Sequence, residues 1–376
     1  MRPDVIIVGL GTMGVAAAHA LAGRGLRVVG LDQFAPPHDR GAHGGGTRMF
    51  RTAYMEGAAY VPLVRESLRL WAEIEAETGA DLVTTTGGLM LGRTDSTAVA
   101  GALHTARAQA LPHELLDAAE VRQRFPAFLP ADDEVGLWEQ GAGFVRPEAA
   151  IAAMADAARK RGADLRPGVT VTGWTAVAGG VTVHCGGSYI DAGRLVLAPG
   201  AWASDLTRLA VPLRVERRVQ HFWRPADPAL FEPDRLPVWI WEHGEDQAYG
   251  MPTVDGQTKA ARHHFAGDVA ALVDPSVGAT PAVPEEAEAM RGWLTTRIPS
   301  LARGAWLGAK PCLYTLTPDE HFVLGHHPEH PGVAVACGFS GHGFKFAPLV
   351  GSILADLTMD DQTSFDIRLF DPARFA

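Results

Sequence analysis

The chain has 376 residues, enough for two domains with separate cores, and its composition, 47% hydrophobic and 20% charged, is ordinary for a globular enzyme. A net charge of −10, with no basic stripe to neutralise phosphates, argues against a nucleic-acid partner. No apolar run is long enough to span a membrane and no signal-peptide pattern is present, so we expect no membrane partner and a cytoplasmic location. Cys185, Cys312 and Cys337 are too few and too scattered for a disulfide framework.

The first 32 residues predict a nucleotide-binding βαβ unit. Residues 4–8 (DVIIV) are typical of a buried strand, residues 9–14 (GLGTMG) match GxGxxG, an alanine-rich helix follows, and a second strand over 26–31 ends at Asp32. The glycines allow a tight turn and the close approach of a pyrophosphate, which the helix N-terminus binds, and the acid accepts from a ribose hydroxyl. The pattern predicts a dinucleotide site but does not distinguish NAD from FAD.

Helices and strands alternate along the rest of the chain. We predict a helix over 59–77, a strand, glycine turn and strand over 81–92, a helix over 148–162, strands over 164–173 and 181–185, a buried strand over 195–198 that runs into Gly200, and an antiparallel sheet within 213–265. The last helix has Phe346, Val350, Ile353, Leu354 and Leu357 at helical spacing, which is typical of a packed core face. This interleaving indicates an α/β fold, α+β overall.

The segment before the last helix predicts a second ligand-binding turn. Cys312 lies among aromatic and polar residues, a strand is expected over 333–336, and the glycine-rich turn 338–343 leads into a helix that carries Lys345. A strand, glycine turn and helix N-terminus together suit an anionic or electron-rich group. Two such places near opposite ends of the chain indicate one large cofactor.

Lysine is rare in this chain. Only Lys160, Lys259, Lys310 and Lys345 occur among the 33 basic residues. Where arginine serves for surface cations, a remaining lysine is expected at positions that need a compact ammonium or a pKa that can shift. Because Lys259 and Lys345 lie in segments with other functional features, we expect both to act in the site.

At this point the residues carry a family resemblance. The chain resembles, essentially end to end, the monomeric sarcosine oxidase and N-methyltryptophan oxidase family of FAD-dependent amine oxidases. Five segments carry the resemblance: VGLGTMG (8–14), PPHDRGAHGGGTRMFRTAYMEG (36–57), QTKAARHH (257–264), KPCLYTLTPDEHF (310–322) and GFSGHGFKF (338–346). The resemblance implies a Rossmann-like FAD-binding domain built from residues 1–78, 142–208 and 311–376. It implies a second, substrate domain of residues 79–141 and 209–310 with a large mixed or antiparallel sheet.

The resemblance also implies which residues hold the cofactor. Cys312 matches the cysteine that the family joins through a thioether to the 8α carbon of the flavin, an 8α-S-cysteinyl link. Asp32 is expected at the adenosine ribose, and Arg48 against the flavin ring. The other expected FAD contacts are Gly9, Gly11, Thr12, Met13, Gly14, Gln33, His43, Thr47, Val171, Gly200, Gly341, His342, Gly343 and Lys345. No metal site is expected.

The remaining carried-over residues concern the substrate and oxygen. Arg51 and Lys345 match a pair of cations that binds the substrate carboxylate. Lys259 matches the lysine held over flavin N5 through a water, where it promotes the reaction with O2. Tyr249, His263, Tyr314, His342 and Ile240 match positions that line the substrate cavity, with Lys259, Arg48, His263 and Tyr249 expected to be catalytic.

The chain departs from the family pattern at three places. The family often has HHGDTR where this chain has HGGGTR at 43–48, KIGYH or KIGKH where it has KAARH at 259–263, and methionine where it has Ile240. These departures leave the expected cofactor contacts in place and leave the identity of the substrate open.

The implied activity is oxidation of a small N-alkyl amino acid to an imine, which hydrolyses to formaldehyde and an amino acid, with O2 reduced to hydrogen peroxide by a monomeric, cytoplasmic enzyme. Three alternatives stay open at this point. They are an FAD-dependent dehydrogenase that uses an acceptor other than O2, an NAD-dependent dehydrogenase, and a non-catalytic flavoprotein.

Overall fold

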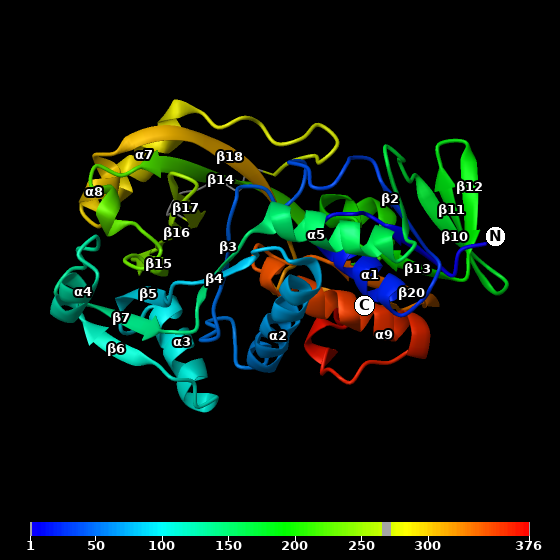
Figure 1. Cartoon of the computed structure of the whole chain (residues 1–376), viewed down its shortest axis with the longest axis horizontal. Coiled ribbons are helices and arrows are strands. Elements are labelled where there is room, and N and C mark those ends of the chain that lie inside the picture. The colour runs from blue at the N-terminus through cyan, green and yellow to red at the C-terminus, as the bar shows by residue number, and fades with distance from the viewer. Residues whose placement is uncertain (1, 265–271, 376) are drawn as a thin grey trace.

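The computed structural model of the chain describes residues 2–264 and 272–375. Figure 1 shows two halves side by side, one built around a six-stranded sheet and the other around an eight-stranded sheet. Among the helices of these described ranges, none is both long enough and apolar enough to cross a membrane.

The six-stranded sheet is assembled from distant parts of the chain. Its order is β19 (Val323–His327), β20 (His330–Cys337), β13 (Arg194–Leu197), β1 (Val5–Val8), β2 (Val28–Asp32) and β9 (Asp164–Pro167). All neighbouring strands are parallel except β19 and β20. The carboxyl ends of parallel strands share one edge of a sheet, so the turns that follow β1, β2, β13 and β20 meet there.

Alternate side chains of β1 enter two different cores. Val5 and Ile7 pack on the face covered by α1 (Thr12–Gly23), α5 (Pro147–Lys160) and α9 (Ala347–Asp360), against which α2 (Tyr60–Thr78) also packs. Ile6 and Val8 pack on the other face, against the sheet of β10 (Gly173–Val177), β11 (Gly180–Cys185) and β12 (Ser188–Ala192). Burial on both faces explains why β1 is apolar at every position.

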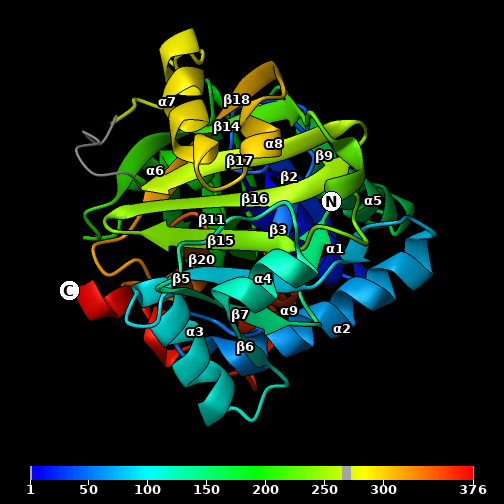
Figure 2. The ribbon, with the colours of Figure 1, turned by 90° about the vertical axis from the view of Figure 1, so that its left-hand side faces the viewer.

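The eight-stranded sheet is mixed. Its order is β18 (Ala305–Leu316), β14 (Arg214–Arg224), β17 (Gln257–His264), β16 (Asp246–Val254), β15 (Val238–His243), β5 (Gly88–Arg93), β7 (Glu134–Glu139) and β6 (Glu114–Asp117). The β15–β5 pair is parallel, and the other pairs are antiparallel. Figure 2 shows β15, β16 and β17 running across the view, in front of the helices of the other half.

The two faces of this sheet differ in what they bury. Trp239 and Trp241 enter an aromatic core with α4 (Ala118–Arg124), α7 (Pro284–Thr295) and α8 (Pro299–Ala302). Ile240, between them, enters the opposite core with α3 (Thr97–Ala108). The period-two alternation of a strand therefore points Ile240 away from its tryptophan neighbours.

Shorter elements complete the structure. A third sheet has the order β3 (Arg48–Phe50), β8 (Gly143–Val145), β4 (Val83–Thr85). The remaining pieces are α6 (Ala203–Leu206) and 3₁₀ turns at Gly200–Trp202, Pro228–Leu230, Phe344–Phe346, Arg368–Phe370 and Pro372–Phe375.

Most predicted elements are found close to their expected bounds, with two differences. The strand expected over 164–173 ends at Pro167. Lys345 lies on the 3₁₀ turn Phe344–Phe346 and not on an α-helix, because α9 begins only at Ala347, where Pro348 takes the first turn. The domain boundary expected at residue 311 falls inside β18.

Candidate active site

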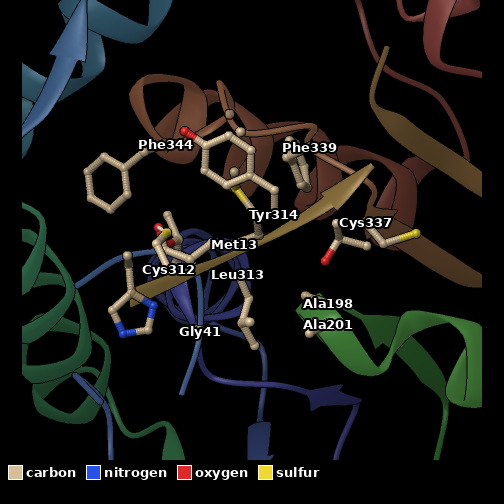
Figure 3. Close-up of a pocket in the computed structure, with 18 of the residues that line it drawn as sticks. Met13, Gly41, Ala198, Ala201, Cys312, Leu313, Tyr314, Cys337, Phe339 and Phe344 are labelled. Carbon is tan, nitrogen blue, oxygen red and sulfur yellow. Dashed lines mark hydrogen bonds between the residues drawn. The ribbon is translucent and has the colours of Figure 1, made fainter. Parts of the chain in front are cut away.

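A cavity of about 460 Å³ lies at the carboxyl edge of the six-stranded sheet and is lined by residues of both large sheets. Its wall includes the turns after β1, β2, β13 and β20 and the carboxyl-terminal part of β18. Figure 3 shows Cys312, Leu313 and Tyr314 along β18, with Phe339 and Phe344 on one side of the strand and Ala198 and Ala201 on the other. The cavity therefore joins the two turns that the sequence predicts as ligand-binding places.

Most of the predicted site residues line this one cavity. They are Gly9, Gly11, Thr12, Met13, Asp32, Gln33, His43, Arg48, Arg51, Val171, Gly200, Ile240, Tyr249, His263, Cys312, Tyr314, Gly341, His342, Gly343 and Lys345. Gly14, Thr47 and Lys259 are buried but do not line it. Among the described residues, no group of side chains could hold a metal ion.

The turn after β1 requires glycine for steric reasons. Gly9 has φ +91°, and a Cβ there would lie 2.3 Å from the carbonyl oxygen of Ala198. A Cβ on Gly14 would lie 1.7 Å from the carbonyl oxygen of Gly9, whereas one on Gly11 would meet nothing closer than 4.0 Å. Gly9 thus lets the turn lie against the end of β13, Gly14 brings α1 close to β1, and Gly11 leaves open space beside the cavity.

Asp32 fixes this turn from the end of β2. Its carboxylate accepts from the backbone amides of Leu10 at 2.6 Å and Phe34 at 2.8 Å. The buried acid therefore holds the glycine turn in place and also lines the cavity.

The turn after β20 also requires glycine for steric reasons. Gly341 has φ +79°, and a Cβ there would lie 2.2 Å from Cε2 of Tyr314. A Cβ on Gly343 would lie 2.5 Å from Cδ1 of Phe339. The turn after β20 can therefore pack against Tyr314 of β18 only because position 341 lacks a side chain, and glycine at position 343 lets the turn fold back onto Phe339.

Arg48 is anchored beside the sulfur of Cys312. Its guanidinium donates to the carbonyl oxygens of Ala42 at 2.8 Å and Gly44 at 2.6 Å, and to Oε1 of Gln220 at 3.1 Å. The same group lies 3.7 Å from Sγ of Cys312. These contacts fix both the planar cation and the thiol at the cavity wall.

The glycine loop 44–47 connects an acid with two cations. Its amides at Gly45 and Gly46 donate to the carboxylate of Glu148, at 2.7 and 3.1 Å for the shortest contacts. On its carbonyl side, Thr47 accepts from Nζ of Lys259 at 2.7 Å and from Arg48 at 2.8 Å. Burial, with Arg48 nearby, lowers the pKa of Lys259 well below its usual range, while Glu148 opposes that shift.

Arg51 is a buried cation with one donor group unused. Its Nη2 donates to both carboxylate oxygens of Glu56, at 2.7 and 2.9 Å, whereas Nη1 has no hydrogen-bond partner among the described residues. Burial alone raises the pKa of Glu56, but Arg51, His342 and Lys345 together lower it to about 2. The pair therefore stays charged and leaves Nη1 available to an anion.

Lys345 is a second buried cation in the same wall. Its Nζ donates to the carbonyl oxygen of His342 at 2.6 Å and to the hydroxyl of Tyr54 at 3.2 Å. Burial and the neighbouring Arg51 lower the pKa of Lys345 to about 7. We call Arg51 and Lys345 together the cation pair.

Aromatic and apolar groups complete the cavity. Tyr249 and Tyr314 both line the cavity, and burial raises the pKa of both hydroxyls. The ring of His263 lies 5.9 Å from that of Tyr314. Ile240 lines the same cavity, as expected.

Sequence reasoning missed four residues that organise the site: Tyr54, Glu56, Glu148 and Gln220. Tyr54 and Glu56 lie inside a segment that carries the resemblance, but no local pattern shows that they contact the cation pair. Glu148 and Gln220 reach the glycine loop from α5 and β14, more than 90 residues away in the chain, so only the fold reveals them.

Comparison with known proteins identifies the family. The profile of the FAD dependent oxidoreductases, DAO, matches residues 4–357. The chain is 46% identical to the monomeric sarcosine oxidase of Streptomyces avermitilis, over 99% of this chain and 98% of the relative, and 34% identical to the N-methyl-L-tryptophan oxidase of Salmonella arizonae, over 100% of both. The solved structure of NikD, an unusual amino acid oxidase essential for nikkomycin biosynthesis, matches with a TM-score of 0.87 and 27% identity, over 99% of this chain and 97% of that chain. These findings confirm the resemblance drawn from the sequence, and the chain belongs to the DAO family of FAD dependent oxidoreductases.

Proposed function

We propose that the protein is an FAD-dependent oxidase of N-methyl amino acids, such as sarcosine or N-methyl-L-tryptophan. The C–N bond of the methylamino group is oxidised to an imine, which water hydrolyses to formaldehyde and the amino acid, and O2 is reduced to hydrogen peroxide. One observation carries this proposal: the buried cation pair, in which Nη1 of Arg51 has no hydrogen-bond partner in the described part of the chain, lines the same cavity as a dinucleotide-binding turn. The names of the sarcosine and N-methyltryptophan oxidases to which the chain is similar support it.

The residues present fit FAD. Two turns that require glycine for steric reasons line one cavity. A Cβ added at Gly11 or Gly200 would meet no atom closer than 4.0 Å, so both positions leave space for a ligand. Gly9, Gly11 and the start of α1 would hold the pyrophosphate, and Asp32 the adenosine ribose. FAD, when bound, accepts two electrons from the substrate and passes them to O2.

Among the three cysteines, we propose that Cys312 alone bears the covalent flavin. Cys312 lines the cavity with the guanidinium of Arg48 at 3.7 Å from its sulfur, an electropositive setting typical of reactive cysteines. Cys337 also lines the cavity, but burial raises its pKa to about 12, which suits an inert buried thiol. Cys185 does not line the cavity.

We propose that the cation pair binds the substrate carboxylate. A carboxylate has two oxygens, and Nη1 of Arg51 and Nζ of Lys345 can each donate to one of them in a charge-assisted hydrogen bond. Tyr249, Tyr314, His263 and Ile240 then surround the remainder of the substrate, and Arg48 lies beside the flavin site. A fixed carboxylate positions the reacting C–N bond, which is the contribution that the protein makes to the chemistry.

Lys259 is proposed to serve the oxygen-consuming half of the reaction. Its ammonium donates a hydrogen bond to the carbonyl oxygen of Thr47. Thr47 precedes Arg48, which lines the cavity, so the positive charge of Lys259 lies just outside the cavity lining. A buried cation stabilises the negative charge that develops when O2 takes up electrons. Its depressed pKa means that the ammonium is lost at a lower pH than in an exposed lysine.

The domain bounds, the oligomeric state and the cellular location are proposed from the family resemblance. We assign residues 1–78, 142–208 and 311–376 to the FAD-binding domain and residues 79–141 and 209–310 to the substrate domain, with β18 extending across their boundary. We propose a monomeric, cytoplasmic enzyme that needs only its amino acid substrate and O2.

A screen for peroxide release tests the proposal. Purified holoenzyme is given sarcosine, larger N-methyl amino acids, and cyclic imino acids such as proline, with O2 as the acceptor and in parallel without O2 but with an artificial dye. Peroxide formed from an N-methyl amino acid supports the proposal. Dye reduction without peroxide formation would instead identify a dehydrogenase.

A further inference from the structure

Tyr54 contacts both members of the cation pair without lining the cavity itself. The guanidinium carbon of Arg51 lies 4.4 Å from the centroid of the Tyr54 ring. Nζ of Lys345 lies 5.1 Å from the same centroid and 3.2 Å from the hydroxyl oxygen. An aromatic face attracts cations, so one buried ring helps to hold two like charges close together.

The hydrogen bonds around Tyr54 have a defined direction. An ammonium can only donate, so Lys345 donates to the hydroxyl oxygen of Tyr54. The hydroxyl donates its own proton to Nδ1 of His342 at 2.7 Å, the shorter of its two contacts with that residue. Because Nδ1 then accepts, the ring proton lies on Nε2, which donates to the carbonyl oxygen of Glu320 at 3.1 Å. His342 is neutral in this arrangement, since burial lowers its pKa to about 4.

We propose that Tyr54 is a positioning residue whose hydroxyl keeps Lys345 charged and aligned with Arg51 for carboxylate binding, an inference that rests on the proposed function of the cation pair. The groups that face the ammonium are few. Arg51 disfavours its charge, Glu56 favours it, and the carbonyl of His342 and the hydroxyl of Tyr54 accept from it. Without the hydroxyl, one acceptor remains for the ammonium among the residues that the structure describes, and the charged form of Lys345 becomes less stable.

The backbone of Lys345 is held independently of Tyr54. Its carbonyl oxygen accepts from Oγ of Ser67 at 2.6 Å and from Nε1 of Trp71 at 2.9 Å, both on α2. Removing the Tyr54 hydroxyl therefore changes the surroundings of the ammonium without releasing the 3₁₀ turn that carries it.

Tyr60 provides a matched control in the same cluster. Its ring stacks on that of Tyr54 at 4.7 Å, and its hydroxyl is hydrogen-bonded to Nδ1 of His321 at 2.8 Å. Tyr60→Phe thus removes a buried tyrosine–histidine bond that is almost identical to the Tyr54–His342 bond. Only Tyr54→Phe also removes an acceptor of Lys345.

The test measures the pH dependence of carboxylate binding. Methoxyacetate resembles sarcosine but has an ether oxygen in place of the amine, so no ligand group titrates in the neutral range. Its Kd for the wild-type, Tyr54→Phe and Tyr60→Phe holoenzymes is measured by calorimetry from about pH 6 to about pH 9. Thermal unfolding curves of each variant verify that the fold is intact.

In the wild type, affinity should fall as pH rises through the pKa of Lys345. Tyr54→Phe should move this fall to lower pH and weaken binding at neutral pH by about tenfold, the scale of one hydrogen bond to a charged group. Tyr60→Phe should leave the profile unchanged. A Tyr54→Phe profile equal to that of the wild type, an equal loss at every pH, or the same shift in Tyr60→Phe would overturn the inference. Failure of the wild type to bind methoxyacetate at any pH would overturn the cation pair's proposed role, and the inference with it.

Discussion

Arg51→Met should weaken carboxylate binding more than Lys345→Met, although each variant removes one buried cation. Each side chain offers the ligand a charge-assisted hydrogen bond, about 1.5–3 kcal/mol. Lys345→Met also removes a repulsion, because Arg51 and Lys345 are neighbouring like charges. Its net loss should therefore lie near the lower limit, about tenfold in Kd.

Arg51→Met has an additional cost. Arg51 binds both oxygens of Glu56, and without it that carboxylate remains unpaired beside the cavity and repels an anionic ligand. The loss should then reach roughly a hundredfold, near the upper limit of the same interaction. Adding Glu56→Gln to Arg51→Met removes the repelling charge and should recover about tenfold in affinity, a coupling that a double-mutant cycle isolates.

Calorimetric titration with methoxyacetate at about pH 6.5, below the pKa of Lys345, measures these losses. Lys160→Met, which changes an exposed lysine on α5, serves as the control for a lost positive charge. Methoxyacetamide, a neutral ligand of similar shape, reports the contacts that do not depend on charge. The reasoning is refuted if Lys345→Met binds more weakly than Arg51→Met, or if Glu56→Gln brings no recovery.

Three further predictions follow from the site. After acid precipitation, Cys312→Ala should release the flavin colour into the supernatant, whereas Cys337→Ala should keep it in the pellet. Colour retained in the pellet of Cys312→Ala would contradict the covalent link. Lys259→Met should slow oxygen consumption by reduced enzyme by much more than about tenfold but leave anaerobic flavin reduction within about tenfold in stopped-flow traces. Because the pKa of Lys259 is depressed, the wild-type oxygen step should slow as pH rises and the ammonium is lost, and Lys259→Met should lack this dependence. The reverse pattern would place Lys259 in substrate binding. Asp32→Ala leaves the amide of Leu10 without its acceptor. The double variant Asp32→Ala/Cys312→Ala should therefore retain FAD on dilution about tenfold more weakly than Cys312→Ala alone. Equal retention by the two variants would show that Asp32 does not hold the turn.

Features that depend on adjacent residues could be predicted from the sequence. The turn after β1 requires glycine at position 14 because of a contact with Gly9 inside one βαβ unit, and the GxGxxG spacing expresses that requirement directly. The buried strand β1 could likewise be predicted from its unbroken apolar run. The match of the DAO profile to residues 4–357 confirms the family that these segments indicated.

Contacts across the fold could not be predicted in this way. The pairing of Arg51 with Glu56, and the contact of Tyr54 with Lys345, depend on how the segment after β3 folds against the turn after β20. Glu148 reaches Gly45 only because α5 packs beside the glycine loop. The burial of Lys259 behind Thr47 depends on the register between β14 and β17, and no local pattern encodes that register.

The most direct test of the account is the stoichiometry of one reaction. Holoenzyme and an N-methyl amino acid that it turns over are followed in a closed oxygen electrode, and formaldehyde, hydrogen peroxide and the demethylated amino acid are measured in the same sample. The account predicts one molecule of each product for every O2 consumed. Substrate loss without O2 uptake, or O2 uptake without formaldehyde, would contradict it.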